Sequence, residues 1–255
     1  MVIGIPKEIK NNEYRVAATP FYVTKLVENG HRVLVEKNAG LGSGFTNQNY
    51  MDAGAFLLDN PRDIFAQSDL IVKIKEPQKT EYDYIKEGQI IFTYFHFSSS
   101  NELLQAMLDK KAVCIAYETV TDNKGGLPLL APMSEVAGRM SIQAGARALE
   151  KSCAGRGMLL GGVPGVEPAK VVVIGGGVAG EHAATMALGM QAEVTVIDIS
   201  LPKLRELDAR FGGHVRTRVS TALEIAEQLK DADLVIGSVL IPGEKAPKLV
   251  TDEMV

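Results

Sequence analysis

Residues 170–180, KVVVIGGGVAG, place an apolar strand directly before three glycines in GxGxxG spacing, and a helical pattern follows over Val178–Met190. In such a strand–turn–helix unit, Gly175 permits a tight turn, Gly177 lets backbone N–H groups approach a pyrophosphate, and Gly180 lets the helix pack on the strand. The helix N-terminus adds partial positive charge at the same place. The segment therefore predicts a Rossmann-type dinucleotide-binding unit.

An acidic residue follows at the expected distance. A second predicted strand, Glu193–Ile197, ends in Asp198, roughly 20 residues after the last glycine, where such folds place the carboxylate that binds the ribose hydroxyls. Because a carboxylate there repels an added 2′-phosphate, NAD is favoured over NADP. Lys203 and Arg205 lie just beyond and could soften that preference, so NADP stays open, as does a purely structural turn with an unrelated acid.

Apolar, β-branched runs alternate with helical patterns along the whole chain, and several runs are continuously apolar, as in strands covered on both faces. A chain of 255 residues is long enough for two domains. We therefore predict an α/β protein with two Rossmann-like domains, mainly parallel sheets and a cleft between them. The predicted strands are Val2–Ile5, Arg32–Glu36, Leu70–Lys73, Gln89–Thr93, Val113–Ala116, Lys170–Ile174, Glu193–Asp198, His214–Arg218 and Leu234–Gly237.

A turn-rich segment at 122–132, DNKGGLPLLAP, indicates a domain boundary at about residue 130. A long helix is predicted after it, from Ser134 to Leu149. We expect residues 1–130 to form a substrate-binding, catalytic domain and residues 131–255 to form an NAD-binding Rossmann domain.

Composition excludes several classes of protein. The chain has 27 Lys and Arg against 31 Asp and Glu, and without a basic block nucleic acid is not an expected partner. No apolar run reaches the ~18–20 residues that cross a bilayer, and Lys7, Glu8 and Lys10 interrupt any signal-peptide core. Cys114 and Cys153 lack CxxC or metal-ligand spacing, so we expect no metal site. Reduced thiols in a cytoplasm are the corresponding expectation.

Three charged or titratable residues of the first half stand near predicted strand ends. Arg15 lies between the first strand and the first helix, Lys75 follows the strand in IVKIKEP, and His96 follows the strand in IIFTYFH. Arg suits a carboxylate, Lys an oxygen that bears charge, and His a proton transfer near neutral pH. From spacing alone, all three could equally be ordinary surface or half-buried residues. Lys73 competes with Lys75, because residues two apart on a strand share a face.

Several segments together resemble the alanine dehydrogenase family, and the resemblance covers the whole chain. The related NAD-binding part of proton-translocating transhydrogenase shares the GIP opening and the dinucleotide signature but lacks equivalents of Lys75 and His96, so the dehydrogenase is favoured. The segments are residues 4–19 (GIPKEIKNNEYRVAAT), 72–77 (VKIKEP), 92–96 (FTYFH), 116–119 (AYET), 127–139 (LPLLAPMSEVAGR), 161–168 (GGVPGVEP) and 170–180.

The resemblance implies reversible oxidative deamination of L-alanine to pyruvate and ammonia with reduction of NAD, in a homo-hexamer. It implies that Arg15 and Lys75 bind the substrate and that His96 is the acid/base. Two alternatives remain, an NAD-binding transhydrogenase subunit and an NAD-binding module without catalysis. With the signature glycines included, the implied cofactor-binding residues are Ser134, Gly175, Gly177, Val178, Ala179, Gly180, Asp198, Lys203, Ser220, Val239 and Leu240.

Chains of this family run well past the last residue of this one, and their further part holds a second catalytic residue, an aspartate. It also holds the last strands of the dinucleotide-binding sheet. We therefore expect the NAD-binding domain to be incomplete at its C-terminal end, with the strand Leu234–Gly237 at an exposed sheet edge.

Overall fold

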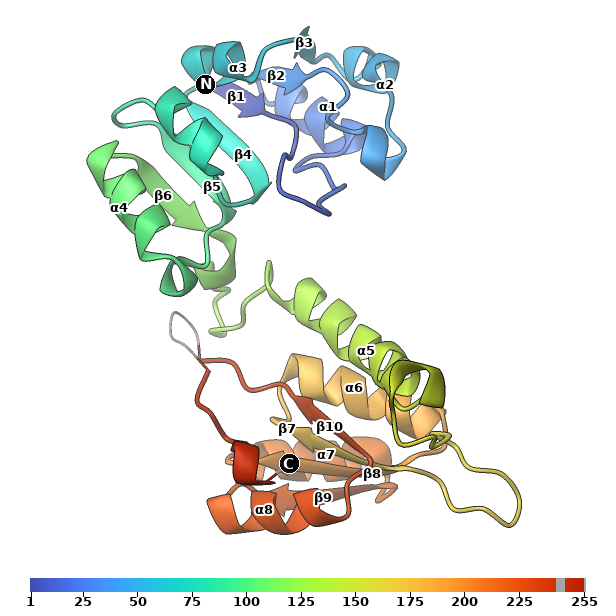
Figure 1. The fold of residues 1–255 in the computed structure, drawn as a ribbon. Helices are drawn as coiled ribbons and strands as arrows, with labels where there is room; N and C mark the ends of the chain where they lie inside the picture. The colour runs from blue at the N-terminus through green and yellow to red at the C-terminus, as the bar shows by residue number, and fades with distance from the viewer. Residues whose placement is uncertain (242–245, 255) are drawn as a thin grey trace. The chain divides into compact units, whose positions relative to one another are not determined.

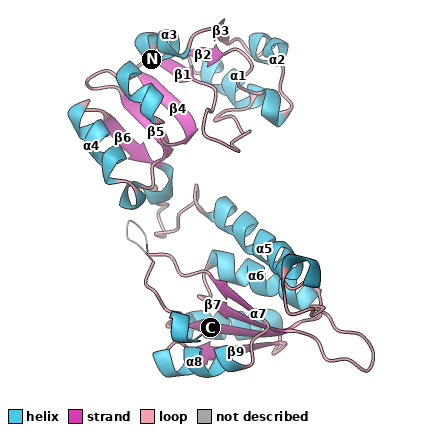
Figure 2. Cartoon of the chain, in the orientation of Figure 1, coloured by secondary structure: helices cyan, strands magenta, loops and turns pink. Residues whose placement is uncertain are grey.

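The structure is a computed structural model that describes residues 1–241 and 246–254. The chain forms two compact units, Met1–Lys124 and Gly125–Val255, and each contains one β-sheet with helices packed on it (Figures 1 and 2). All strand pairs in both sheets are parallel. The predicted α/β class with parallel sheets is confirmed.

The first unit holds a six-stranded sheet in the order β3-β2-β1-β4-β5-β6. The chain runs from β1 to β2 on one side and returns to β4 on the other, so the carboxyl ends of β1 and β4 form a topological switch point, where α/β sheets usually bind ligands. Its elements are β1 (Val2–Ile5), α1 (Pro20–Glu28), β2 (Arg32–Glu36), α2 (Asn47–Asp52), β3 (Phe56–Leu58), α3 (Pro61–Gln67), β4 (Leu70–Lys75), β5 (Ile90–Tyr94), α4 (Asn101–Asp109) and β6 (Val113–Ala116).

Alternate residues of β2 pack into two separate apolar clusters of the first unit. Val33 and Val35 of β2 pack with Tyr50 in one cluster, whereas Leu34 packs with Phe65 in the other. Because side chains alternate across a strand, burial on both faces requires the continuous apolar runs seen in the sequence.

The second unit holds a four-stranded sheet in the order β10-β7-β8-β9. β7 lies between β10 and β8, so the glycine turn after β7 and the segment after β10 meet at the switch point. The described elements are α5 (Ala131–Ala148), β7 (Lys170–Ile174), α6 (Val178–Gly189), β8 (Glu193–Asp198), α7 (Leu201–Phe211), β9 (Val215–Val219), α8 (Ala222–Lys230) and β10 (Leu234–Gly237).

Helix α5 packs closely along α6 (Figure 1). Gly138 of α5 faces the carbonyl of Ala179 in the first turn of α6, and a Cβ at Gly138 would lie 2.1 Å from that oxygen. Only a residue without a side chain permits this approach.

The predicted strands are all present, with ends that shift by a residue or two. β3 was not predicted, because three residues give too short a run to show a period. Helix α5 begins at Ala131 rather than Ser134, with Pro132 in its first turn, where proline is tolerated. β10 lies at an edge of its sheet. No helix among the described residues is long and apolar enough to cross a membrane.

Candidate functional site

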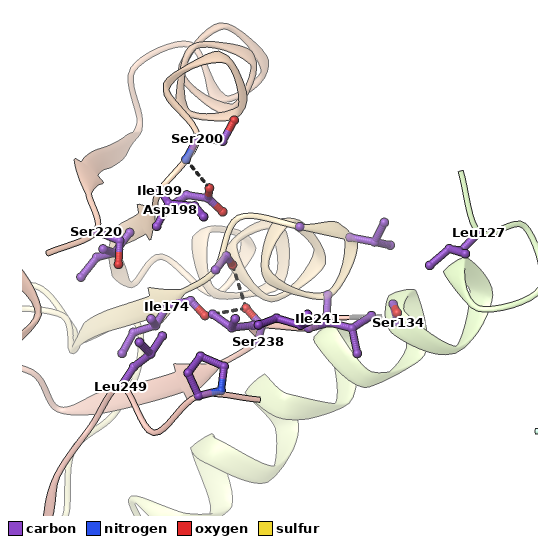
Figure 3. A pocket seen from close by; sticks show the side chains of 18 of the residues that line it. Leu127, Ser134, Ile174, Asp198, Ile199, Ser200, Ser220, Ser238, Ile241 and Leu249 are labelled. Atoms are coloured by element: carbon purple, nitrogen blue, oxygen red, sulfur yellow. Dashed lines mark hydrogen bonds between the residues drawn. The ribbon is translucent and has the colours of Figure 1, made fainter. Parts of the chain in front are cut away.

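A cavity of about 650 Å³ lies within the second unit, at the carboxyl ends of β7, β8 and β10 and beside the start of α5 (Figure 3). It lies where the strand order predicts a ligand site. The residues of the predicted cofactor set that line it are Ser134, Gly175, Gly177, Val178, Ala179, Asp198, Ser220, Val239 and Leu240.

The glycine turn is built as the signature requires. Gly175 has φ of +100°, a conformation that strongly favours glycine. A Cβ at Gly180 would lie 1.8 Å from the carbonyl oxygen of Gly175, so Gly180 is needed for packing beneath the turn and does not itself line the cavity. Gly177 is the N-cap of α6 and contributes no capping side chain, which leaves the first N–H groups of the helix for an anion.

Asp198 is fixed by two backbone donors. Its Oδ2 accepts a hydrogen bond from Gly176 N–H at 2.6 Å and its Oδ1 accepts one from Ser200 N–H at 2.7 Å, the latter drawn in Figure 3. It is the one charged residue among the described residues that line the cavity. An oriented carboxylate at this place suits ribose hydroxyls and disfavours a phosphate.

Lys203 is not among the residues that line the cavity. Its Nζ contacts Glu181 Oε2 at 2.9 Å and Glu206 Oε1 at 2.8 Å. Burial lowers the pKa of Lys203, but its hydrogen bonds to Glu206 and Glu181 outweigh burial and raise the pKa overall. The structure thus places Lys203 in an ion-pair cluster, whereas the family resemblance implies a cofactor contact.

In the first unit, the three predicted substrate and catalytic residues gather around Tyr94, the last residue of β5. Lys75 is the register partner of Tyr94 in β4. The imidazole of His96 stacks on the Tyr94 ring, with centroids 6.0 Å apart and an interplanar angle of 9°. Burial raises the pKa of Tyr94 and the nearby charge of Arg15 opposes that rise, so Arg15 also lies close to this ring.

Glu13 holds Arg15 in place. Its carboxylate accepts hydrogen bonds from Arg15 Nε at 2.8 Å and Arg15 Nη2 at 2.6 Å, a bidentate pair. The Arg15 hydrogen bond is the main cause of the lowered pKa of Glu13, and the charge of Lys75 contributes too. Glu13 therefore lies near both cations.

The structure separates Lys73 from Lys75. Phe92 and Tyr94 of β5 pair with Val72 and Lys75 of β4, so β4 carries one extra residue at this point. Because of this irregularity, Lys75 lies on the same face of the sheet as Val72, opposite to Lys73. The prediction that both lysines share a face is therefore wrong. Lys73 is fully buried, and Lys75 is partly exposed.

Lys73 is enclosed by two carboxylates. Its Nζ lies 3.3 Å from Glu8 Oε2 and 2.9 Å from Glu81 Oε1, and both side chains are nearly inaccessible to solvent. Glu8 Oε1 accepts a hydrogen bond from Ile74 N–H at 2.6 Å and a longer one from Lys75 N–H at 3.4 Å. This buried group therefore fixes the end of β4 from which Lys75 emerges.

His96 has a left-handed backbone, with φ of +50°, which is uncommon and strained for a residue with a side chain. Glu118 stabilises it, since its Oε1 accepts a hydrogen bond from His96 N–H at 2.6 Å. Ser99 Oγ donates to the His96 carbonyl at 2.7 Å. The imidazole is about half exposed, and its Nδ1 lies 4.0 Å from Glu118 Oε1. The ring is thus available to a ligand.

Family models match nearly the whole chain. The model of the N-terminal domain of alanine dehydrogenase/PNT matches residues 4–137, and the model of the C-terminal domain matches residues 141–255. The chain belongs to the alanine dehydrogenase/PNT family. The resemblance inferred from the motifs is confirmed.

Individual members of the alanine dehydrogenase/PNT family are similar over the full chain. The alanine dehydrogenases of Methanococcus maripaludis and Bacillus subtilis are 55% and 54% identical over 255 residues, and the chain spans 68% and 67% of their lengths. A solved L-alanine dehydrogenase structure has a TM-score of 0.90 at 47% identity, with 70% of that chain covered. The transhydrogenase structure from Sinorhizobium meliloti has a TM-score of 0.82 at 28% identity, with 74% covered.

Glu13, Tyr94 and Glu118 are not among the predicted site residues. Glu13 and Arg15 stand two residues apart in NNEYR, a weak signal for an ion pair in a loop. Tyr94 ends an apolar strand, where an aromatic residue is ordinarily part of the core. Glu118 comes from a short turn, and no local pattern links it to His96.

Proposed function

We propose that this chain catalyses the reversible oxidative deamination of L-alanine to pyruvate and ammonia with NAD. The observation that carries the proposal is the arrangement of Arg15, Lys75 and His96 around Tyr94 in the first unit. The names of its relatives, more than half identical over the whole chain, support it.

The cavity of the second unit fits NAD. The close approach at Gly180 forms a tight turn for a pyrophosphate, and the oriented carboxylate of Asp198 suits an unphosphorylated ribose. The chemistry that bound NAD supplies is the acceptance of a hydride from the α-carbon of alanine.

The residues of the first unit then have distinct tasks. Arg15, held by Glu13, provides positive charge for the carboxylate of alanine. Lys75 stabilises negative charge on the oxygen that becomes the ketone of pyruvate. Loss of the hydride converts alanine to an imine, to which water adds. His96 takes a proton from that water and returns one to the amine nitrogen as ammonia leaves. A homo-hexamer and a cytoplasmic location belong to the same proposal and rest on the family resemblance.

The direct test is the loss of NADH absorbance when the purified protein receives pyruvate and ammonium together. Omitting either substrate should abolish the signal, and L-alanine with NAD should give the reverse reaction. A protein that binds NADH but shows neither reaction would be an NAD-binding module without this catalysis. Binding without amino-acid chemistry, but with hydride transfer to a nucleotide on a partner, would indicate a transhydrogenase subunit.

The Gly180→Ala variant tests the role of the turn. A Cβ at this position meets backbone, 1.8 Å from the Gly175 oxygen, so α6 must move away from β7. We expect a loss of about 1–3 kcal/mol in the free energy of unfolding and a weaker NADH affinity, measured by nicotinamide fluorescence. Gly189→Ala is the matched control in the same helix, because nothing lies within 4 Å of its Cβ. Equal NADH affinity in both variants would contradict this role for the turn.

A further inference from the structure

Lys203, the first cationic residue after Asp198 in the chain, does not line the cavity, because its ammonium group is bound elsewhere. Ile199 and Ser200 line the cavity, and α7 begins directly after them. Lys203 stands in the first turn of α7, where its N–H donates to Ser200 Oγ at 3.3 Å. Its side chain therefore starts beside the ribose end of the cavity. Its Nζ is bound by carboxylates outside the cavity lining.

Glu181 is the carboxylate that joins α6 to this side of α7. It stands in the first turn of α6, and only 11% of its side chain is exposed. Its Oε2 binds Lys203 at 2.9 Å, and its Oε1 pairs with Arg210. Lys203 and Arg210 lie two turns apart on one face of α7, so a single buried carboxylate holds both cations.

Glu206, the second partner of Lys203, is different. It lies on the same helix, three residues along, and 60% of its side chain is exposed. Exposed pairs of this spacing contribute little to geometry or energy. Glu181 is therefore the partner that determines where the Lys203 ammonium lies.

A 2′-phosphate would add about two negative charges next to Asp198. No lysine or arginine lines the described part of the cavity, so nothing there offsets that charge. A lysine on the first turn of α7 has a flexible four-carbon stem and could supply the counter-charge if it were released.

We propose that Glu181 is a specificity-determining residue, which binds Lys203 and Arg210 and so denies a 2′-phosphate its counter-charge. The inference rests on the proposed function, because it assumes that this cavity takes the adenosine half of NAD. Asp198 then excludes NADP by repulsion, and Glu181 excludes it by keeping the cations elsewhere.

The test is the ratio of NADPH to NADH dissociation constants, measured by nicotinamide fluorescence. The protein contains no tryptophan that would interfere. In an Asp198→Ala background, adding Glu181→Gln should improve NADPH affinity by about tenfold, as one charge-assisted contact does, and change NADH affinity by less than about twofold. With Lys203→Met also present, most of that gain should disappear.

Two control variants separate this role from a general loss of negative charge or of packing. Glu206→Gln removes the exposed partner and should change the ratio by less than about twofold. Glu181→Asp keeps the charge and should keep the preference for NADH. If the Gln variant unfolds, Glu181→Met provides the same test with an apolar side chain of similar size.

A gain that survives Lys203→Met in full, or no gain at all, would overturn the inference while the wild-type protein still binds NADH. If the wild-type protein binds neither nucleotide, the proposed function fails and the inference fails with it.

Discussion

Replacing His96 by alanine should lower kcat for alanine oxidation and for pyruvate amination by about 10²–10⁴-fold, the usual contribution of a positioned general acid/base. Water addition and ammonia loss both need a proton carrier, and His96 supplies the imidazole stacked on Tyr94. NADH affinity should stay within about twofold, because the cavity that we propose for the cofactor lies within the other unit. Steady-state kinetics and nicotinamide fluorescence measure the two quantities.

A matched control is available at His214, which is exposed in the second unit. His214→Ala should leave kcat within about twofold of the wild type. Because His96 has a left-handed backbone, His96→Asn is a useful second variant, since asparagine tolerates that conformation. If either His96 variant turned over at the wild-type rate, the acid/base assignment would be wrong.

The largest loss of stability is expected for Lys73→Met. Removing this ammonium leaves Glu8 and Glu81 as two buried carboxylates without their common counter-charge. Breaking a buried ion pair from one side typically costs about 3–5 kcal/mol in the free energy of unfolding. Urea denaturation followed by tyrosine fluorescence reports the unfolding of the first unit, because all 7 tyrosines lie there.

Lys75→Met is the matched control, with the same substitution two residues along β4. Lys75 is partly exposed, and no hydrogen bond or ion pair to its Nζ is found among the described residues, so its stability change should stay within about 0.5 kcal/mol. Its turnover should fall instead. Equal destabilisation by the two variants would contradict this assignment of roles.

The cost of Lys73→Met should also depend on pH. Burial raises the pKa of Glu8, while the charge of Lys73 and the N–H of Ile74 lower it. Removing Lys73 moves the folded pKa further above the unfolded value. Such a carboxyl destabilises the fold at pH values above its folded pKa, and the penalty fades as the pH falls toward the unfolded pKa. The difference in stability from the wild type should therefore shrink as the pH falls toward the unfolded pKa of the carboxyl group, whereas a constant difference would exclude Glu8 as its source.

Local patterns were sufficient to predict most of the architecture. Strands buried on both faces need long apolar runs, and the turn after β7 needs glycine because backbone atoms approach within contact distance at Gly180. Both requirements produce a recognisable pattern within a few consecutive residues of the sequence. β3 escaped prediction for the opposite reason, because its three residues leave no pattern.

The chemistry of the first unit was less predictable, because it depends on pairing between strands. The side on which Lys75 emerges is set by the register of β4 against β5, where Lys75 pairs with Tyr94. The alternation of residues along the sequence does not reveal that irregularity. The pairing of His96 N–H with Glu118 likewise joins segments that are distant in the sequence. Residue types at strand ends therefore indicated candidates, while tertiary contacts determined their surroundings.

The absence of a side chain at Gly138 has a consequence for the second unit. Because Gly138 lets α5 approach the first turn of α6 at Ala179, the rim of the cavity at Ser134 belongs to the same rigid body as the glycine turn after β7. The width of the cavity on this side is then set by the spacing of two helix axes, not by adjustable side chains. A nucleotide that reaches Ser134 would contact a surface that cannot adjust, so the shape of the ligand should determine selectivity there more than its charge.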